Sequence, residues 1–246
     1  MTNELSVDIA LPRIALAIGA HPDDIEFQCG ATLAKWARSG CSIHLLILTD
    51  GSKGSWNPQA DRGTLVDVRR SEARSAACLL GAEPAHVVFL DSPDGELSAG
   101  TNETVDVCSV IRSVRPDAIL GHDPWKRYRL HPDHRAAGFI TVDALVAARE
   151  PHFTAGQTNP PHRPTSLLLF EADQVDHIED VQGFEEHKVA ALLAHESQYP
   201  STMNIKDVGD ARGISRFREW VLDDLSQKGS LADRSAGEAF KLITDL

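Results

Sequence analysis

The fold is decided by the stretch Arg13-Ile14-Ala15-Leu16-Ala17-Ile18-Gly19, which is followed at once by Ala20-His21-Pro22-Asp23-Asp24. The apolar part predicts a buried strand, and the polar part brings ionisable side chains to the point where that strand ends. Because Pro22 fixes its own φ and biases His21 toward an extended backbone, this turn is stiff. Ligands of open α/β sheets bind beyond the carboxyl ends of the strands. On its own, the turn fits equally well a polar loop with an Asp that caps the next helix.

The overall composition is that of an acidic globular protein with 246 residues, a formal net charge of -12 and 42% hydrophobic residues. This length predicts one α/β domain over residues 1–246. The negative charge argues against nucleic acid and against an anionic membrane as partners. The four cysteines are widely spaced without a Cys-x-x-Cys pair, which is typical of a reducing compartment. Since no signal-like or bilayer-length apolar segment is present, we expect a cytoplasmic protein, and homo-oligomer formation stays open.

Alternating strand and helix patterns predict a parallel sheet with right-handed crossovers. Strands are expected at residues 13–19, 41–49, 86–90, 117–121 and 166–170. Helices are expected at residues 30–38, 67–80, 105–114, 131–148 and 184–195, with a further amphipathic segment at 217–225. Segments rich in Gly, Pro and polar residues predict loops at 51–66, over the sheet edge that carries the first turn, and at 150–165, where the loop would form a lid.

Polar turns end four of these strands, at residues 21–24, 50, 91–94 and 122–125, and each turn carries His or Asp. One such ending is ordinary, because Asp is a good turn residue. Four endings at one edge of a parallel sheet would form an acidic, histidine-bearing cleft, which favours a metal site. The chain lacks the glycine-rich signatures of dinucleotide and P-loop sites and the Gly-x-Ser-x-Gly elbow of serine hydrolases.

A second His-Pro-Asp occurs at His131-Pro132-Asp133-His134, at the start of a predicted helix. Residues three apart share a helix face, so His131 and His134 can point into the same cleft. Catalytic zinc commonly takes three protein ligands and leaves one position for water, which becomes ionisable near neutral pH. The alternative is that Asp133 caps the helix and His134 lies on the surface.

Together these motifs resemble the PIG-L/LmbE-like zinc-dependent de-N-acetylases, which include the N-acetylglucosaminyl-phosphatidylinositol, mycothiol-pathway and bacillithiol-pathway deacetylases. The resemblance runs nearly end to end, because further short motifs follow in the family's order: Arg69-x-x-Glu72, Pro93-Asp94-Gly95-Glu96-Leu97, Lys188 with His195-Glu196-Ser197-Gln198, and Glu238-Ala239-Phe240. Each motif is weak alone, whereas the ordered set is specific. It implies a Rossmann-like three-layer α/β fold with a mainly parallel central sheet, the site at the carboxyl ends of the strands, and one Zn2+ per chain.

Site roles follow from the same resemblance. It implies zinc ligands at His21, Asp24 and His134. It implies Asp23 as the general base that takes a proton from water and returns it to the leaving amine, and His131 as the group that stabilises the oxyanion.

Substrate-binding and supporting residues are also implied: Arg69 and Asp94 on the sugar side, and Asp133 as the partner that orients a histidine. For Arg69, the adjacent Arg70 is a competitor, and a surface pair between Arg69 and Glu72 is the alternative.

Two positions leave alternatives open. Some family members carry a tyrosine two residues before the first His of the second motif, where this chain has Arg129, preceded by Tyr128. Either Tyr128 takes over that role in substrate binding, or Arg129 reads an anionic substrate. His195 either closes the cleft as a supporting group or caps its helix.

We therefore expect a zinc-dependent hydrolase that removes an N-acyl group, expected to be acetyl, from a small molecule containing an amino sugar such as N-acetylglucosamine. One alternative is an amidase that cleaves the same kind of bond in a thiol or antibiotic conjugate. Another is a metal-binding protein without catalysis. Asp23 beside the ligands argues against the last alternative, because a structural metal site needs no base.

Overall fold

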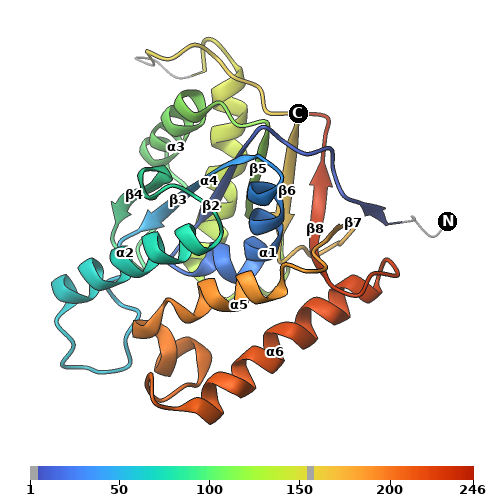
Figure 1. The fold of residues 1–246 in the computed structure, drawn as a ribbon. Helices are drawn as coiled ribbons and strands as arrows, with labels where there is room; N and C mark the ends of the chain where they lie inside the picture. The colour runs from blue at the N-terminus through green and yellow to red at the C-terminus, as the bar shows by residue number, and fades with distance from the viewer. Residues whose placement is uncertain (1–4, 154–157) are drawn as a thin grey trace.

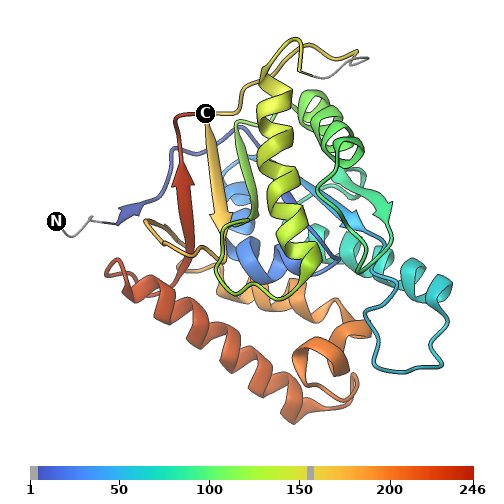
Figure 2. The same ribbon diagram turned by 180° about the vertical axis from the view of Figure 1, so that it is seen from behind.

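The computed structural model describes residues 5–153 and 158–246, in which one sheet lies between helices on both faces (Figures 1 and 2). Within these residues the sheet has eight strands in the order β1-β7-β8-β6-β5-β2-β3-β4. Their bounds are β1 (Ser6–Val7), β2 (Ile14–Gly19), β3 (Ser42–Thr49), β4 (Val87–Ser92), β5 (Ala118–His122), β6 (Ser166–Phe170), β7 (His177–Asp180) and β8 (Gly237–Ile243). All neighbours are parallel except the two pairs that involve β8, so the predicted α/β class with a mainly parallel sheet is confirmed.

Six α-helices in the described ranges complete the layers: α1 (Asp24–Arg38), α2 (Arg62–Leu79), α3 (Thr101–Val114), α4 (Pro132–Arg149), α5 (Glu185–Leu193) and α6 (Ala211–Ser230). Side chains of β3 alternate between the two faces, as the period of a strand requires. Leu45 and Ile47 pack with α1 and α2, whereas Leu46 and Leu48 pack with α3 and α4. The helices α5 and α6 form an outer layer beside α1. No helix among the described residues combines the length and apolar character needed to cross a bilayer.

The position of the site follows from the strand order. β2 pairs with β3 on one side and with β5 on the other, so the chain reverses its direction of winding at β2. At such a switch point the loops after the two strands diverge and leave a crevice for ligands. The His21 turn leaves β2 at this crevice, and β5 ends there at His122.

Helix α1 is kinked at Cys29, whose φ of -142° and ψ of 19° are not helical. The freed backbone groups are satisfied by two buried side chains from distant elements. Glu238 in β8 accepts hydrogen bonds from the amides of Ala31 (3.2 Å) and Thr32 (2.8 Å), which start the second half of the helix. Lys188 in α5 donates to the Phe27 carbonyl before the kink and to Glu238, both at 2.6 Å. This pair therefore stabilises the helix that carries Asp24.

Several predicted boundaries were wrong. The helix expected at residues 30–38 is only the second half of α1, because the polar first half, with Glu26 and Gln28, hides the apolar periodicity. Part of the loop expected at 51–66 is helical, since α2 begins at Arg62 after Asp61 accepts a hydrogen bond from the Thr64 amide. Helix α6 extends well beyond the predicted segment 217–225 at both ends.

The strands β1, β7 and β8 were not predicted. Two of them carry buried charged or polar side chains, His177 and Glu179 in β7 and Glu238 in β8, which interrupt the apolar pattern of a strand. β1 has only two residues and gives no periodic signal.

The predicted lid at 150–165 is also wrong for its described parts, 150–153 and 158–165. The His162 amide donates to the Ala148 carbonyl at the end of α4, and the Thr165 amide donates to the Asp117 carbonyl just before β5. These contacts lie at the opposite edge of the sheet from the carboxyl ends of the strands (Figure 2). Residues 154–157 of this segment lie outside the described residues.

Candidate active site

The three predicted zinc ligands converge on one point. Nδ1 of His21 lies 3.2 Å from Nε2 of His134, and the Asp24 carboxylate lies 3.4 Å from the first atom and 3.2 Å from the second. Neighbouring ligands of a tetrahedral zinc ion with bonds of about 2.0–2.1 Å are separated by roughly 3.3 Å. Two imidazole nitrogens and a carboxylate at this spacing therefore fit a divalent metal in both chemistry and distance.

The turn after β2 explains how His21 and Asp24 meet. The His21 amide donates to Oδ2 of Asp24 at 2.7 Å, and the Asp24 amide faces the His21 carbonyl at 3.3 Å. Between them Asp23 takes the N-cap position of α1 with a φ of 119°, in the left-handed region that non-glycine residues rarely adopt. Its side chain makes no capping hydrogen bond. Strain of this kind is typical of functional sites, and here it leaves the carboxylate of Asp23 available.

Asp23 is buried, and burial together with the neighbouring charge of Asp24 raises its pKa to about 6, although Arg69 opposes this rise. Nη2 of Arg69 lies 3.6 Å from Oδ2 of Asp23. The same guanidinium donates to the Gly51 and Pro22 carbonyls at 2.8 and 2.7 Å, so it ties the two loops together next to Asp23. A carboxylate with a pKa near neutrality is well suited to accept and return a proton.

The alternative for Arg69, a surface pair with Glu72, is wrong. Arg69 is buried, and Glu72 accepts hydrogen bonds from the amide and hydroxyl of Ser197 instead. Arg70 points to the surface, where it pairs with Asp91.

Asp133 and Asp94 surround the other nitrogen of His21. Oδ2 of Asp133 lies 3.0 Å from Nε2 of His21, and Oδ1 of Asp94 lies 3.3 Å from it. Asp133 also accepts hydrogen bonds from the amides of Gly95 and Leu97, which fixes its position. In the neutral ring, donation of the Nε2 proton to Asp133 would leave the Nδ1 lone pair for a metal ion. This contact is the one that the predicted role of Asp133 requires.

The pKa values around the cluster follow its charges. Burial lowers the pKa of His21, but Asp133, Asp24 and Asp94 outweigh it and raise the pKa well above the usual value. Burial raises the pKa of Asp24, yet His134 and the other histidines hold it well below the usual value. Asp94 has a pKa of about 2, because His21 overcomes the effect of burial. The carboxylates are thus ionised, as metal ligands and their partners need to be.

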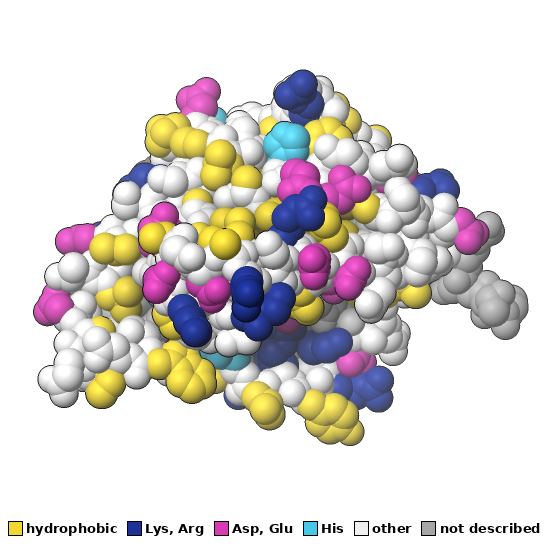
Figure 3. Space-filling view, turned by 60° about the horizontal axis from the view of Figure 1, so that its bottom comes forward, with side chains coloured by type: hydrophobic (Ala, Val, Ile, Leu, Met, Phe, Trp, Pro, Cys, Tyr) yellow, Lys and Arg dark blue, Asp and Glu magenta, His cyan; other side chains and the backbone are white. Residues whose placement is uncertain are grey.

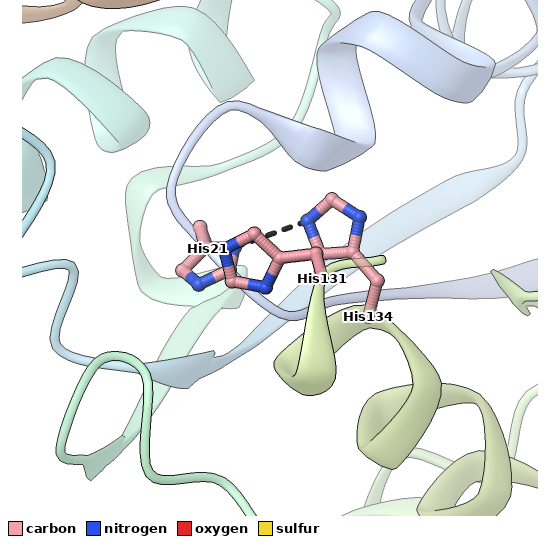
Figure 4. Close-up of side chains that lie close together, drawn as sticks. All are labelled: His21, His131 and His134. Carbon is pink, nitrogen blue, oxygen red and sulfur yellow. Dashed lines mark hydrogen bonds between the residues drawn. The ribbon is translucent and has the colours of Figure 1, made fainter. Parts of the chain in front are cut away.

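His131 lies beside the cluster at the N-cap of α4 (Figure 4). Its ring centroid is 4.7 Å from that of His21 and 4.6 Å from that of His134. Burial, His21 and His134 lower its pKa, which favours the neutral ring. A neutral imidazole here can donate one hydrogen bond toward a neighbouring oxygen.

His122 and Glu171 belong to the site, although sequence reasoning assigned them no role. Nε2 of the buried His122 lies 3.3 Å from Oδ2 of Asp24, and its Nδ1 lies 3.4 Å from Oε2 of Glu171. His122 is the last residue of β5, and Glu171 directly follows β6. A polar residue at the end of a strand was the signal in the sequence that could have identified them. His122, Asp24 and His134 form a second group of donors close enough to share a metal.

Of the two alternatives before the second motif, Arg129 reaches this cluster and Tyr128 does not. Nη1 of Arg129 contacts Glu171 and lies 3.1 Å from Nδ1 of His134. Tyr128 is 92% exposed, and neither Tyr128 nor Arg129 is among the residues that line the cavity over the cluster.

His195 is fully buried close to Asp23. Its Nε2 lies 3.6 Å from Oε2 of Glu26, and its charge helps to lower the pKa of Asp23. Neither ring nitrogen has a hydrogen-bond partner among the described residues, and the side chain makes no helix-capping bond. The His195 side chain therefore caps no helix, and it is not among the residues that line the cavity over the cluster, so its supporting role stays a prediction.

A cavity of about 440 Å3 opens over the cluster at the carboxyl edge of the sheet, and Figure 3 views the molecule from this side. The predicted residues that line it are His21, Asp23, Asp24, Arg69, Asp94, His131 and His134. Other parts of the wall come from Phe27, Gln28, Lys53, Gln198, Thr202 and Trp220. The wall is therefore charged and hydrogen-bonding around the donors and aromatic toward α6.

Comparison with known proteins relates this chain to a family of enzymes. Residues 16–145 match the family described as GlcNAc-PI de-N-acetylase, PIG-L. Diacetylchitobiose deacetylase of Thermococcus kodakarensis is 34% identical over 188 residues, which cover 75% of this chain and 70% of the relative. The solved structure of N,N'-diacetylchitobiose deacetylase from Pyrococcus horikoshii, in complex with its inhibitor, has a TM-score of 0.84 and 25% identity, over 95% of this chain and 84% of that chain.

The fold is also similar to that of an enzyme with another reaction. A 4-oxalmesaconate hydratase from Pseudomonas putida is 28% identical over 59% of this chain and 56% of the relative. The match to the Thermococcus deacetylase, a hydrolase of amide C–N bonds, is higher in identity and covers more of the chain. Since the family match spans more than half of the chain and the Thermococcus deacetylase matches at 34% identity, this chain belongs to the PIG-L de-N-acetylase family.

Proposed function

We propose that this protein is a zinc-dependent N-deacetylase that hydrolyses the acetamide group of an N-acetylated amino sugar. The observation that carries the proposal is the arrangement of Asp23. Its carboxylate is buried, carries no capping bond and lies between a three-donor cluster and the Arg69 guanidinium. A structural metal site has no use for such a base.

His21, Asp24 and His134 would hold the metal, because their donor atoms already lie 3.2–3.4 Å apart. When bound, a zinc ion polarises a substrate carbonyl and lowers the pKa of water. The remaining tasks fall to the protein's own side chains.

Asp23 accepts the proton of the attacking water and later gives it to the leaving amine. Its pKa of about 6 makes both transfers accessible near neutral pH. The buried charge of Arg69 keeps this pKa from rising further. His131, at the N-cap of α4 in the cavity wall, donates a hydrogen bond to the oxyanion that develops as the amide carbonyl is attacked.

The cavity supports a sugar substrate. Its volume of about 440 Å3 falls in the usual range for small-molecule sites. Gln28 and Lys53 add an amide and an amine to the wall, which suit hydroxyl groups. The four cysteines are all free, which fits the proposed reducing, cytoplasmic setting.

The test is a substrate panel on the purified protein, loaded with zinc and analysed for metal content. It includes N-acetylglucosamine, N,N'-diacetylchitobiose, a larger N-acylated conjugate and 4-oxalmesaconate. We expect about one zinc per chain and acetate release from the acetamido sugars. Consumption of 4-oxalmesaconate without acetate release would instead identify a hydratase, and release only from the conjugate would identify an amidase of larger substrates.

A further inference from the structure

The turn that follows β3, residues 51–54, packs two glycines against a buried guanidinium, that of Arg69. A Cβ atom at Gly54 would lie 2.1 Å from Nη1 of Arg69, and a Cβ atom at Gly51 would lie 2.8 Å from the same nitrogen. Both distances are below 3.0 Å, a separation that Cβ atoms essentially never show. We name residues 51–54 the glycine turn. Its shape leaves room for the guanidinium only because these two positions lack side chains.

Hydrogen bonds fix the glycine turn in place. The Gly51 carbonyl accepts hydrogen bonds from the Gly54 amide at 3.3 Å and from Nη1 of Arg69 at 2.8 Å. The Lys53 amide donates to Oδ2 of Asp94 at 2.9 Å, which joins the turn to the loop after β4. Outward movement of the turn, which would make room for a side chain at Gly54, therefore costs these bonds.

The Arg69 side chain is held as firmly as the turn, since only 2% of the residue is exposed. Its Nη2 donates to the Pro22 carbonyl at 2.7 Å and lies 3.6 Å from Oδ2 of Asp23. Because non-bonded atoms need a separation of roughly 3.5 Å, a methyl group at Gly54 would move the guanidinium by more than about 1 Å. Such a movement breaks the bond to Gly51 and changes the position of the charge beside Asp23.

We propose that Gly54 is a positioning residue, which acts through Arg69 on the buried carboxylate of Asp23. The glycine turn and the Pro22 carbonyl form a seat for one guanidinium, and this seat determines where the positive charge lies beside Asp23. The inference rests on the proposed function, in which Asp23 is the general base. A misplacement of about 1 Å in an active site can reduce the rate roughly 100-fold, so the position of this charge matters for turnover.

Gly54 also lines the cavity, so crowding of the substrate by an added methyl group is the competing explanation. A double-mutant cycle separates the two effects. Gly54→Ala should keep its zinc but reduce kcat for acetate release about 10- to 100-fold, with little change in KM. In the Arg69→Ala background the same substitution should reduce kcat less than about 3-fold, because the guanidinium that it displaces is absent. An equal reduction in both backgrounds would overturn the positioning role of Gly54.

Chemical rescue provides a readout that a merely structural role would not change. Millimolar guanidinium chloride should restore the activity of Arg69→Ala severalfold, because the free ion can donate to the same Gly51 and Pro22 carbonyls. It should not rescue the double variant Gly54→Ala/Arg69→Ala, in which the methyl group fills the seat. Potassium chloride at the same ionic strength is the control for the added salt. Rescue of both variants, or of neither, would overturn the proposed seat.

Gly63→Ala is the matched control for the substitution itself. This exposed glycine lies in the first turn of α2, where a Cβ atom would lie 3.7 Å from Oδ1 of Asp61, an ordinary contact. The variant should keep the kcat and KM of the unaltered chain.

Stability provides a measurement that needs no turnover. In urea denaturation, Gly54→Ala should lower the midpoint more in the unaltered chain than in Arg69→Ala, because removal of the guanidinium relieves the clash. This comparison also decides if Gly54→Ala is too unstable for a kinetic assay, and equal losses would overturn the seat. Absence of acetate release from every acetamido sugar would instead overturn the proposed function, while the stability cycle would still test the contact between Gly54 and Arg69.

Discussion

Nε2 of His122 lies 3.3 Å from Oδ2 of Asp24, which places a fully buried imidazole against a carboxylate of the proposed metal-binding cluster. The opposite nitrogen of the same ring lies 3.4 Å from Glu171. Partners of this kind orient a ligating carboxylate, and their loss commonly reduces metal affinity 10- to 100-fold.

His122→Phe should therefore weaken zinc binding by roughly 10- to 100-fold, because the substitution keeps the ring shape but removes both nitrogens. Competition with a chelator measures the affinity, and circular dichroism checks that the variant is folded. His187→Phe, on the exposed side of α5, serves as the matched control. Unchanged affinity in His122→Phe would show that Asp24 needs no such partner.

Arg129 and Glu171 should affect zinc binding in opposite directions. The Arg129 guanidinium lies 3.1 Å from Nδ1 of His134 and places a positive charge beside the site of a cation. We expect Arg129→Met to tighten zinc binding and Glu171→Gln to weaken it, each by severalfold. The adjacent, exposed Tyr128→Ala is the control. The same chelator competition decides, and weaker binding in Arg129→Met would contradict this assignment.

Asp23→Asn should retain zinc but lose acetate release by at least about 100-fold, because the amide cannot accept the proton of water. Metal analysis and an acetate assay on the same preparation separate the two effects. Asp91→Asn provides a control at an exposed carboxylate that pairs only with Arg70 among the described residues. If Asp23→Asn remains active, another group is the base.

The buried pair of Lys188 and Glu238 should contribute strongly to stability. Removing one partner leaves the other charge uncompensated, so Glu238→Gln and Lys188→Met should each reduce the free energy of unfolding by about 3–5 kcal/mol. Urea denaturation measures this loss. The exposed pair of Arg218 and Glu186 is the comparison, for which Glu186→Gln should cost less than about 1 kcal/mol. Equal, small losses would mean that the kink of α1 is stable without its buried partners.

His44 should make stability sensitive to acid. Its ring stacks on His86 at 3.8 Å, and burial, with the charge of His86, lowers its pKa from 6.5 to about 4. Between these values the unfolded chain binds a proton at His44 that the folded chain does not bind, so stability falls as the pH falls through this window. His44→Phe should reduce the difference between urea midpoints measured at about pH 7 and about pH 5. His187→Phe should leave that difference as it is.

The contiguous part of the site was accessible from the sequence. His21 to Asp24 and His131 to His134 are short motifs at a strand end and a helix start, and such local patterns show which side chains share a place. The parallel sheet was also predictable, because its inner strands, such as β3, are continuous apolar runs.

The parts of the site and of the fold that were not predicted depend on contacts between segments far apart in the sequence. His122 and Glu171 lie next to Asp24 only because β5 and β6 follow β2 in the sheet order, which no local pattern encodes. β8 was not predicted because Glu238 is polar and yet buried. Its carboxylate accepts hydrogen bonds from amides of helix α1, which replace the hydrogen bonds that water would otherwise donate. Strand prediction from apolar periodicity therefore fails at buried polar residues of this kind.

The capping of α1 by Glu238 has a consequence for how the protein matures. All proposed metal donors lie between His21 and His134, whereas the carboxylate that completes α1 belongs to β8, more than a hundred residues later in the chain. A ribosome releases the donors well before it releases β8, so the growing chain carries one of them, Asp24, on a helix whose central amides still face water. We therefore expect stable zinc loading to begin only after synthesis has passed β8, as a final step of assembly.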